Sequence, residues 1–224
     1  RSTVFLFGLD AQYFNILVDN VPLVNEAGVG NNTDLSQINL NDVERIEIVE
    51  GSMGVVYGAN AVSGVLNIIT KKSSNYKWGI NAYVQEETVS DEYSLFKEGR
   101  HIQSLKVSHS FNKNWFASLG ANRNDFQGYL NDKEGMDYFE NDQKRGYRWL
   151  PKDQLNTTAL IAYNKDNFRF FYRFEFFDEN VDYYNSTVQS GFNPVTGSYR
   201  YSDDKSYFTN RYYHNFNSVG KLFS

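Results

Sequence analysis

The chain contains no cysteine and only 3 prolines and 2 methionines among its 224 residues. Without cysteine there can be no disulfide framework, no thiolate nucleophile and no Cys-ligated zinc. No run of about 18 apolar residues occurs, which excludes a transmembrane helix. The net charge is −5, with acidic and basic residues interspersed. This argues against nucleic acid as the main partner, which would require a basic face.

Aromatic residues, in contrast, are abundant: the chain has 17 tyrosines and 18 phenylalanines. Flat rings pack well on pleated surfaces, so this composition favours β-strands. The mean hydropathy of −0.58 is typical of a soluble protein. A membrane β-barrel has a similar average, because apolar residues that face lipid alternate with polar residues that face the lumen.

The first part of the chain, up to Lys72, contains short apolar runs separated by glycines. Its patterns predict three strands, a helical turn that Asp34 caps, and a short helix that begins at Ser52 and stops at Gly58. The predicted strands are 14–18, 43–49 and 62–70. We interpret this part as a small α/β unit that is too short to be a complete domain.

The second part contains about six alternating segments, each long enough for a tilted strand to cross a bilayer. In the strongest of them, aromatic residues from Phe168 to Phe176 occupy one face, opposite Arg169, Arg173 and Glu175. The six segments begin at Tyr76, Arg100, Trp115, Leu155, Phe168 and near Tyr207.

The connections between these segments alternate in length. Residues 112–114 and 164–167 form short connections, whereas 86–99, 125–153 and 178–206 are long and polar. Short turns on one rim and long loops on the other are typical of outer-membrane barrels. The alternative is a soluble all-β sandwich or barrel. Wholly aromatic strand faces and the alternation of loop length favour the membrane barrel.

Three stretches of the first part carry a resemblance to a known family: Ile16–Leu23, Val43–Gly51 and Val56–Lys71. In order and spacing they resemble the plug domain of TonB-dependent outer-membrane receptors. The resemblance implies that residues 1–72 are the C-terminal part of a plug and that residues 76–224 supply the first six or so barrel strands. Because Arg1 follows no leader segment, we expect an internal fragment of a bacterial outer-membrane protein.

The resemblance implies a function in active import. In this family a ligand binds the plug apex and the extracellular loops, and TonB pulls on the plug through a segment expected before Arg1. A barrel of about 22 strands has a wide lumen, which the plug must fill. The implied partners are TonB, a nutrient ligand and outer-membrane lipid; a surface lipoprotein lid is left open.

The expected substrate is a scarce metal chelate, either a ferric siderophore or cobalamin. Glycan-importing relatives tend to have Asn-Gly-Val before the last plug strand, whereas this chain has Ser63-Gly64-Val65. Glycan or peptide import is therefore the alternative within the family, and a surface-adhesion barrel is the alternative outside it. No nucleophile, base and orienting group assemble in the sequence, so we predict no catalytic site and no enzyme.

Two sets of plug residues are predicted from the resemblance to have specific roles. A polar loop is expected to present hydrogen-bonding groups to the ligand, although such residues are also ordinary turn formers. Arg45 and Glu47 share one strand face and are expected to lock the plug to charged partners on the barrel, because an unpaired charge inside the lumen would be costly. The ligand-contacting residues of the loop are Asn25, Glu26, Asn31, Asn32 and Thr33.

A third candidate site is the acidic loop between the third and fourth segments. Clustered carboxylates at an extracellular rim are suitable ligands for Ca²⁺, although most acidic loops are simply solvated. The candidate ligands are Asp132, Glu134, Asp137, Glu140 and Asp142. The three histidines, His101, His109 and His214, lie on different predicted strands without metal-ligand spacing.

Overall fold

The computed structural model describes residues 13–23, 38, 42–51, 61 and 63–221. These residues form three β-sheets and no helix. Accordingly, none of the described segments is a helix that could cross a membrane. The predicted helical turn at 34–37 and the predicted helix at 52–58 lie outside the described residues.

The first part of the chain forms a four-stranded sheet in the order β2-β1-β4-β3. Its strands are β1 (Phe14–Val18), β2 (Val21–Pro22), β3 (Val43–Glu50) and β4 (Gly64–Thr70). β1 runs parallel to β4, and β3 is antiparallel to it. Both faces of β1 are buried, which explains its continuous apolar sequence. Phe14, Ile16, Val18 and Ile68 form one core cluster, and Leu17, Ala61 and Val65 form a second.

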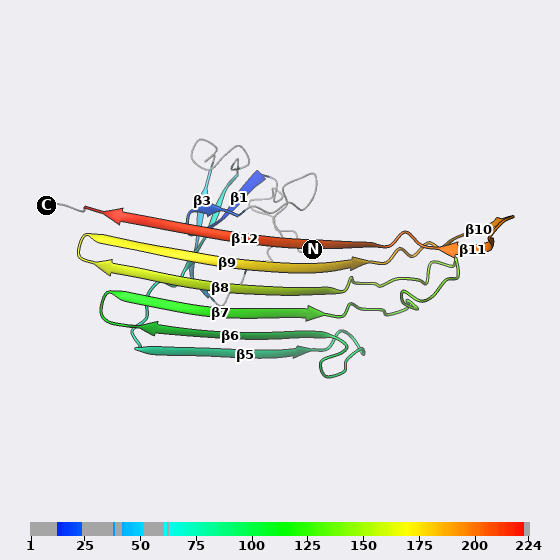
Figure 1. The fold of residues 1–224 in the computed structure, drawn as a ribbon, viewed down its shortest axis with the longest axis horizontal. Coiled ribbons are helices and arrows are strands. Elements are labelled where there is room, and N and C mark those ends of the chain that lie inside the picture. The colour runs from blue at the N-terminus through cyan, green and yellow to red at the C-terminus, as the bar shows by residue number, and fades with distance from the viewer. Residues whose placement is uncertain (1–12, 24–37, 39–41, 52–60, 62, 222–224) are drawn as a thin grey trace.

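The second part forms one open, antiparallel sheet of six long strands, as the sequence pattern predicted (Figure 1). Consecutive strands pair, in the order β12-β9-β8-β7-β6-β5. Their bounds are β5 (Trp78–Glu87), β6 (Arg100–Ser110), β7 (Trp115–Phe126), β8 (Lys152–Lys165), β9 (Phe168–Tyr183) and β12 (Lys205–Gly220). Short turns join the strands at one end of the sheet, and long loops join them at the other.

The last long loop contains a hairpin that the sequence analysis did not predict. β10 (Gln189–Asn193) pairs with β11 (Gly197–Tyr201) beyond the end of the large sheet (Figure 1). The turn is local: the side chain of Asn193 accepts hydrogen bonds from the amides of Val195 and Thr196. Gly197 adopts a φ of 88°, which favours glycine. The asparagine and glycine were visible in the sequence, but the polar composition of this segment concealed its pairing.

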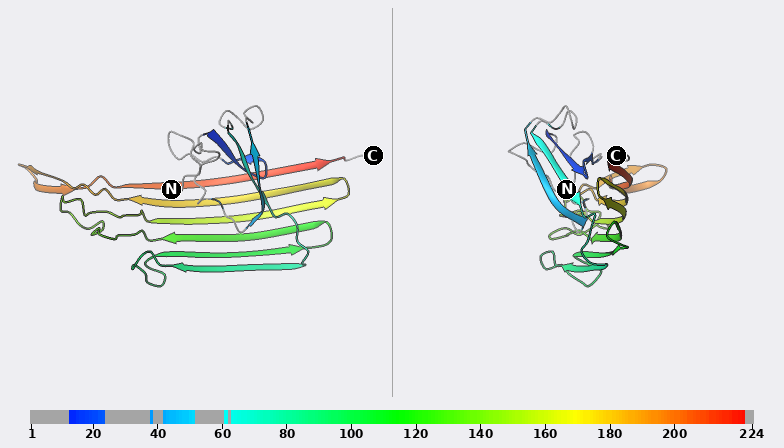
Figure 2. Two further views of the ribbon diagram at one scale, coloured as in Figure 1. Left: turned by 180° about the vertical axis from the view of Figure 1, so that it is seen from behind. Right: turned by 90° about the vertical axis from the view of Figure 1, so that its left-hand side faces the viewer.

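The two faces of the large sheet differ in chemistry, as the strand alternation predicted. The small sheet lies against one face, which we name the inner wall; the other is the outer face (Figure 2). On β9, Arg173 and Glu175 are buried on the inner wall. Phe170, Tyr172 and Phe174 alternate with them and therefore lie on the outer face.

Aromatic rings form a band on the outer face near the short turns. The ring of Trp115 lies 4.9 Å from that of Tyr163 and 5.6 Å from that of Phe170. The ring centre of Phe170 in turn lies 6.1 Å from that of Phe216, which extends the band to β12. Such a girdle is characteristic of the boundary between hydrocarbon and water in membrane barrels. Toward the long loops the same face becomes charged, for example where Arg123 pairs with Asp125 and Asp153 at 3.1 Å.

The long loops are joined to one another by charged side chains. The carboxylate of Glu92 accepts hydrogen bonds from the backbone amides of Leu130 and Asn131, which connects the first loop to the second. Arg145 is only 2% exposed and donates two hydrogen bonds of 2.7 Å to Asp204, which connects the second loop to the third. The loops therefore form one linked unit above the strands.

We expect Trp115 to contact lipid in the full-length protein. The fluorescence of Trp115 is the part of the parent protein's signal that a Trp115→Phe variant lacks. In bilayers with brominated acyl chains, bromine should strongly quench this part of the signal. Trp149 lies in a long loop and is 56% exposed. Its fluorescence, identified with Trp149→Phe in the same way, should be insensitive to bromine in the lipid but quenched by iodide in the water. Equal iodide quenching of both tryptophans would contradict a lipid-facing outer face.

The link between Arg145 and Asp204 should depend on pH. The hydrogen bonds from Arg145 lower the pKa of the Asp204 carboxyl below its ordinary value of 3.8. A carboxyl whose pKa is lower in the folded state stabilises that state above its unfolded pKa, and the contribution is lost as the pH falls through the folded pKa. The link should therefore persist at pH 5 and break only below the ordinary carboxyl pKa of 3.8.

Hydrogen exchange of residues 185–204, corrected for intrinsic rates, measures this link. Hydrogen bonds to charged groups contribute about 1.5–3 kcal/mol, so Asp204→Asn should accelerate exchange at pH 6 by roughly tenfold. Asp203→Asn is the matched control, because Asp203 accepts only an exposed hydrogen bond from Gln189. Equal protection of the parent and Asp204→Asn proteins at pH 6 would rule out the link.

Candidate functional site

Asp42, directly before β3, makes a concentrated polar contact between the two sheets. Its side chain is 6% exposed. It forms an ion pair with Lys106 of β6, accepts a hydrogen bond of 3.1 Å from the hydroxyl of Thr158 of β8, and lies 4.0 Å from Arg173 of β9. A single carboxylate of the small sheet thus contacts three strands of the inner wall.

The register of the large sheet explains how these partners converge. Lys106, Gly120, Thr158 and Glu175 are paired in sequence across β6, β7, β8 and β9, so they form one row on the inner wall. Gly120 is the member without a side chain; a Cβ there would lie 3.1 Å from the hydroxyl oxygen of Thr158. Glycine inside a strand often marks a close approach by another segment. A side chain at Gly120 would crowd Thr158 and Lys106, the two neighbours in the row that contact Asp42.

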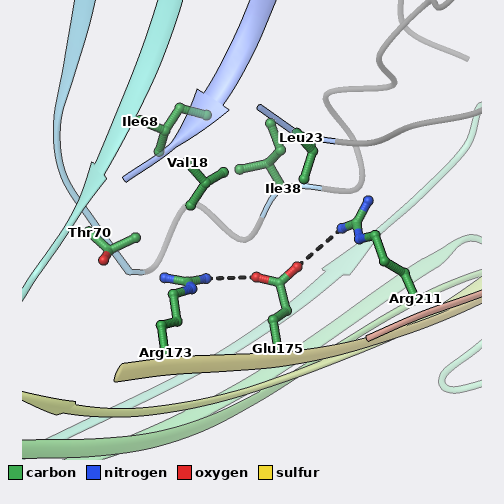
Figure 3. A pocket seen from close by; sticks show the side chains of 8 residues that line it. All are labelled: Val18, Leu23, Ile38, Ile68, Thr70, Arg173, Glu175 and Arg211. Carbon is green, nitrogen blue, oxygen red and sulfur yellow. Dashed lines mark hydrogen bonds and ion pairs between the residues drawn. The ribbon is translucent and has the colours of Figure 1, made fainter. Parts of the chain in front are cut away.

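Beside this contact, the inner wall carries a buried chain of charges, shown in Figure 3. Glu175 pairs with Arg173 at 2.7 Å through one carboxylate oxygen and with Arg211 at 3.1 Å through the other. These three residues form one side of a small pocket. The opposite side comes from the small sheet and its neighbouring segments, namely Val18, Leu23, Ile38, Ile68 and Thr70. This part of the wall contains three cations, Lys106, Arg173 and Arg211, but only the carboxylate of Glu175. The carboxylate of Asp42 therefore reduces the excess positive charge of the wall.

A second contact fixes the point at which the chain passes from one sheet to the other. Asp19 is 2% exposed and accepts hydrogen bonds from the amide of Thr70 at 3.0 Å and from Lys72 at 2.5 Å. Asn20 follows it at a φ of 67°, a left-handed conformation that asparagine tolerates. The ammonium of Lys72 also lies 4.6 Å from the ring centre of Phe171 on the inner wall.

The sequence-predicted plug residues are placed as follows. The ligand-loop candidates Asn25, Glu26, Asn31, Asn32 and Thr33 lie outside the described residues. Arg45 and Glu47 share a face of β3, as predicted, but they pair with each other at 2.8 Å, and both are exposed. Their predicted partners on the barrel are not among these contacts, so the locking role of this pair stays a prediction.

Asp42 was missed by the sequence analysis, although its position offered a signal. It is an acidic residue directly before a strand that begins at the inner wall. The stronger signal was on the other side: Gly120 interrupts an alternating strand, and Lys106 stands on a face that is otherwise rich in serine. Only the pairing of distant strands brings these residues together.

The acidic loop does not gather its carboxylates. Among the described residues, no group of three or more carboxylate, histidine or cysteine side chains is close enough to hold a metal ion. Glu140 instead pairs with Arg200 at 2.7 Å. The carboxylate of Asp142 accepts a hydrogen bond from Tyr138, which raises the pKa of that phenol to about 12. The calcium ligands Asp132, Glu134, Asp137, Glu140 and Asp142 therefore remain a sequence-based prediction.

The three histidines lie apart. His101 is buried, with its Nδ1 at 2.5 Å from the carboxylate of Glu86. His109 packs against Trp78, with ring centres 4.0 Å apart. His214 forms a hydrogen bond of 2.8 Å with Tyr172 on the outer face. Each histidine therefore has its own structural neighbours.

Comparison with known proteins agrees with this architecture. Residues 1–65 match the family model described as the TonB-dependent receptor plug domain. The siderophore receptor PirA from Acinetobacter baumannii is structurally similar, with a TM-score of 0.57 and 20% sequence identity over 79% of this chain and 25% of that receptor.

A ferric enterobactin receptor from Pseudomonas aeruginosa, a Q482A mutant in complex with enterobactin, also has a TM-score of 0.57. The match has 14% identity and covers 94% of this chain and 39% of that one. At these identities the likeness concerns the fold, and the chain spans between a quarter and two fifths of the length of these receptors.

Residues 1–65 therefore match a TonB-dependent receptor plug domain, and the small sheet followed by the large open sheet has the plug and barrel-strand fold of TonB-dependent outer-membrane receptors.

Proposed function

We propose that the receptor to which this chain belongs imports a ferric siderophore across the outer membrane, using energy delivered to the plug by TonB. The observation that carries the proposal is the contact at Asp42, in which a plug carboxylate is buried against cations of the barrel wall. Support for the substrate comes from the similar solved structures, which are siderophore and enterobactin receptors.

The chemistry of the plug contact suits a reversible seal. Charged groups lose much of their hydration when buried, so a buried ion pair gains little over the hydrated, separated state. Water entering the interface can stabilise Asp42, Lys106 and Arg173 after separation. An apolar contact of the same size would lose its stabilisation on opening. A pulling force can therefore open the polar contact at a smaller cost.

Three further roles belong to this proposal. The loop residues Asn25, Glu26, Asn31, Asn32 and Thr33 would contact the arriving ligand. Arg45 and Glu47 would form an additional lock with other parts of the barrel. A surface lipoprotein lid is a further candidate partner. Cobalamin, glycan and peptide substrates are the alternatives that the following experiment separates.

The substrate class is tested by growth of a strain that lacks the full-length receptor gene. We expect the deletion to abolish growth on ferric enterobactin as the iron source and the intact gene to restore it. Growth on ferrous iron, which needs no chelate receptor, is the control. A defect confined to cobalamin-, glycan- or peptide-dependent growth would instead identify that substrate and reject the siderophore.

The role of Asp42 is tested by Asp42→Ala in the full-length receptor. Removing one member of a buried ion pair leaves the others uncompensated, at a cost of about 3–5 kcal/mol. The variant should loosen the plug, so cells should become sensitive to large antibiotics that the outer membrane normally excludes. Glu44→Ala is the matched control: Glu44 pairs with Arg45 on the exposed face, where such a pair contributes about 0–1 kcal/mol.

Equal antibiotic sensitivity in the two variants, at equal surface abundance, would show that Asp42 does not hold the plug. Gly120→Val provides an independent check from the barrel side. Its side chain would crowd the Thr158 hydroxyl and Lys106, which both contact Asp42, so it should increase sensitivity in the same direction as Asp42→Ala.

A further inference from the structure

The inner wall changes character next to the Asp42 contact. In the two rows that follow the Lys106–Gly120–Thr158 row toward the long loops, β7 and β8 present only amide side chains. Asn122 pairs in register with Asn156, and Asn124 pairs with Gln154. We name these four residues the amide patch. In the row of Asn122 and Asn156, the neighbouring strand β6 contributes Ser104 and the neighbouring strand β9 contributes Phe177.

The amide patch contains buried polar atoms without partners. Asn156 is 4% exposed, and neither its Nδ2 nor its Oδ1 has a hydrogen-bond partner. The Oδ1 atoms of Asn122 and Asn124 are likewise unpartnered. Buried polar side chains nearly always have a partner, since leaving one unpaired costs free energy. Four unpaired atoms on adjacent strands therefore require an explanation.

Part of the patch is already oriented by its surroundings. Glu179 accepts a hydrogen bond of 2.5 Å from Gln154, and the Oε1 of Gln154 accepts one of 3.1 Å from Asn124. These two hydrogen bonds fix which atom of each amide faces the interior, and they leave the Oδ1 of Asn124 available as an acceptor. Asn156 adds both a donor and an acceptor beside it. The patch thus offers donors and acceptors in fixed positions and carries no charge of its own.

We propose that the amide patch is a hydrogen-bonding subsite of the barrel wall for neutral amide and hydroxyl groups of the solute in transit. This inference rests on the proposed import function and adds a location and a chemistry to it. The patch adjoins the residues that hold Asp42, so we expect separation of the plug at that contact to uncover it. A solute that replaces the plug can then pair with atoms that have no partner at rest.

Access to the patch is tested by thiol labelling in a full-length receptor freed of other cysteines; this chain contains none. Asn156→Cys should react slowly with a membrane-impermeant maleimide while Asp42 is intact, and at least several-fold faster when combined with Asp42→Ala. Thr157→Cys is the matched control, because residue 157 lies on the outer face and should stay unreactive in both backgrounds. If Asp42→Ala leaves the labelling of Asn156→Cys unchanged, the subsite is not uncovered and the proposal is wrong.

Solute contact is tested by energised uptake of ⁵⁵Fe-loaded enterobactin. The double variant Asn122→Leu with Asn156→Leu should lower the uptake rate by about tenfold, while chelate binding to de-energised cells stays within twofold of the parent. Asn122→Ser with Asn156→Ser, which keeps hydrogen-bonding groups, should recover much of the rate. Unchanged uptake in the leucine variant would overturn the proposal. If the parent itself imports no ferric enterobactin, the substrate assignment fails, and the labelling result decides the subsite independently.

Discussion

Every long strand in this chain separates two environments that demand opposite side chains. Because successive residues of a strand point to opposite faces, one sequence can satisfy both demands only by strict alternation. β9 shows the result: Phe170, Tyr172 and Phe174 lie on the outer face, whereas Arg173 and Glu175 are buried against the plug. The low mean hydropathy follows from the same alternation, since half of each strand is polar.

The polar inner wall in turn determines how the plug is held. A plug that packed by apolar contacts alone would be stable, but its removal would expose the same apolar surface to water. Here the contact at Asp42 is ionic, and its partners Lys106 and Arg173 come from separate strands of the wall. A buried ion pair contributes little net stability to the folded state, but removing one of its partners lowers that stability strongly. The arrangement therefore specifies where the plug sits more than it strengthens the fold.

The wall is also divided into regions with different roles. The row that contains Gly120 receives the plug, while the adjacent rows carry the amide patch, whose unpaired atoms are suited to a solute. Farther out, the long loops are connected by Glu92 and by the pair of Arg145 with Asp204. Connected loops have less conformational freedom to lose on binding a partner than separate ones.

The sequence by itself determined the six long strands, the order of short and long connections, the aromatic outer face and the plug strands. All of these follow from local periodicity or from motif spacing, which are properties of neighbouring residues. It did not reveal the β10–β11 hairpin, whose polar strands lack an apolar alternation. Only the tertiary structure decided that Asp42 contacts the described wall, and that Asn122 lies beside Asn156. These contacts join residues tens of positions apart, and their geometry depends on strand register, which no local pattern records.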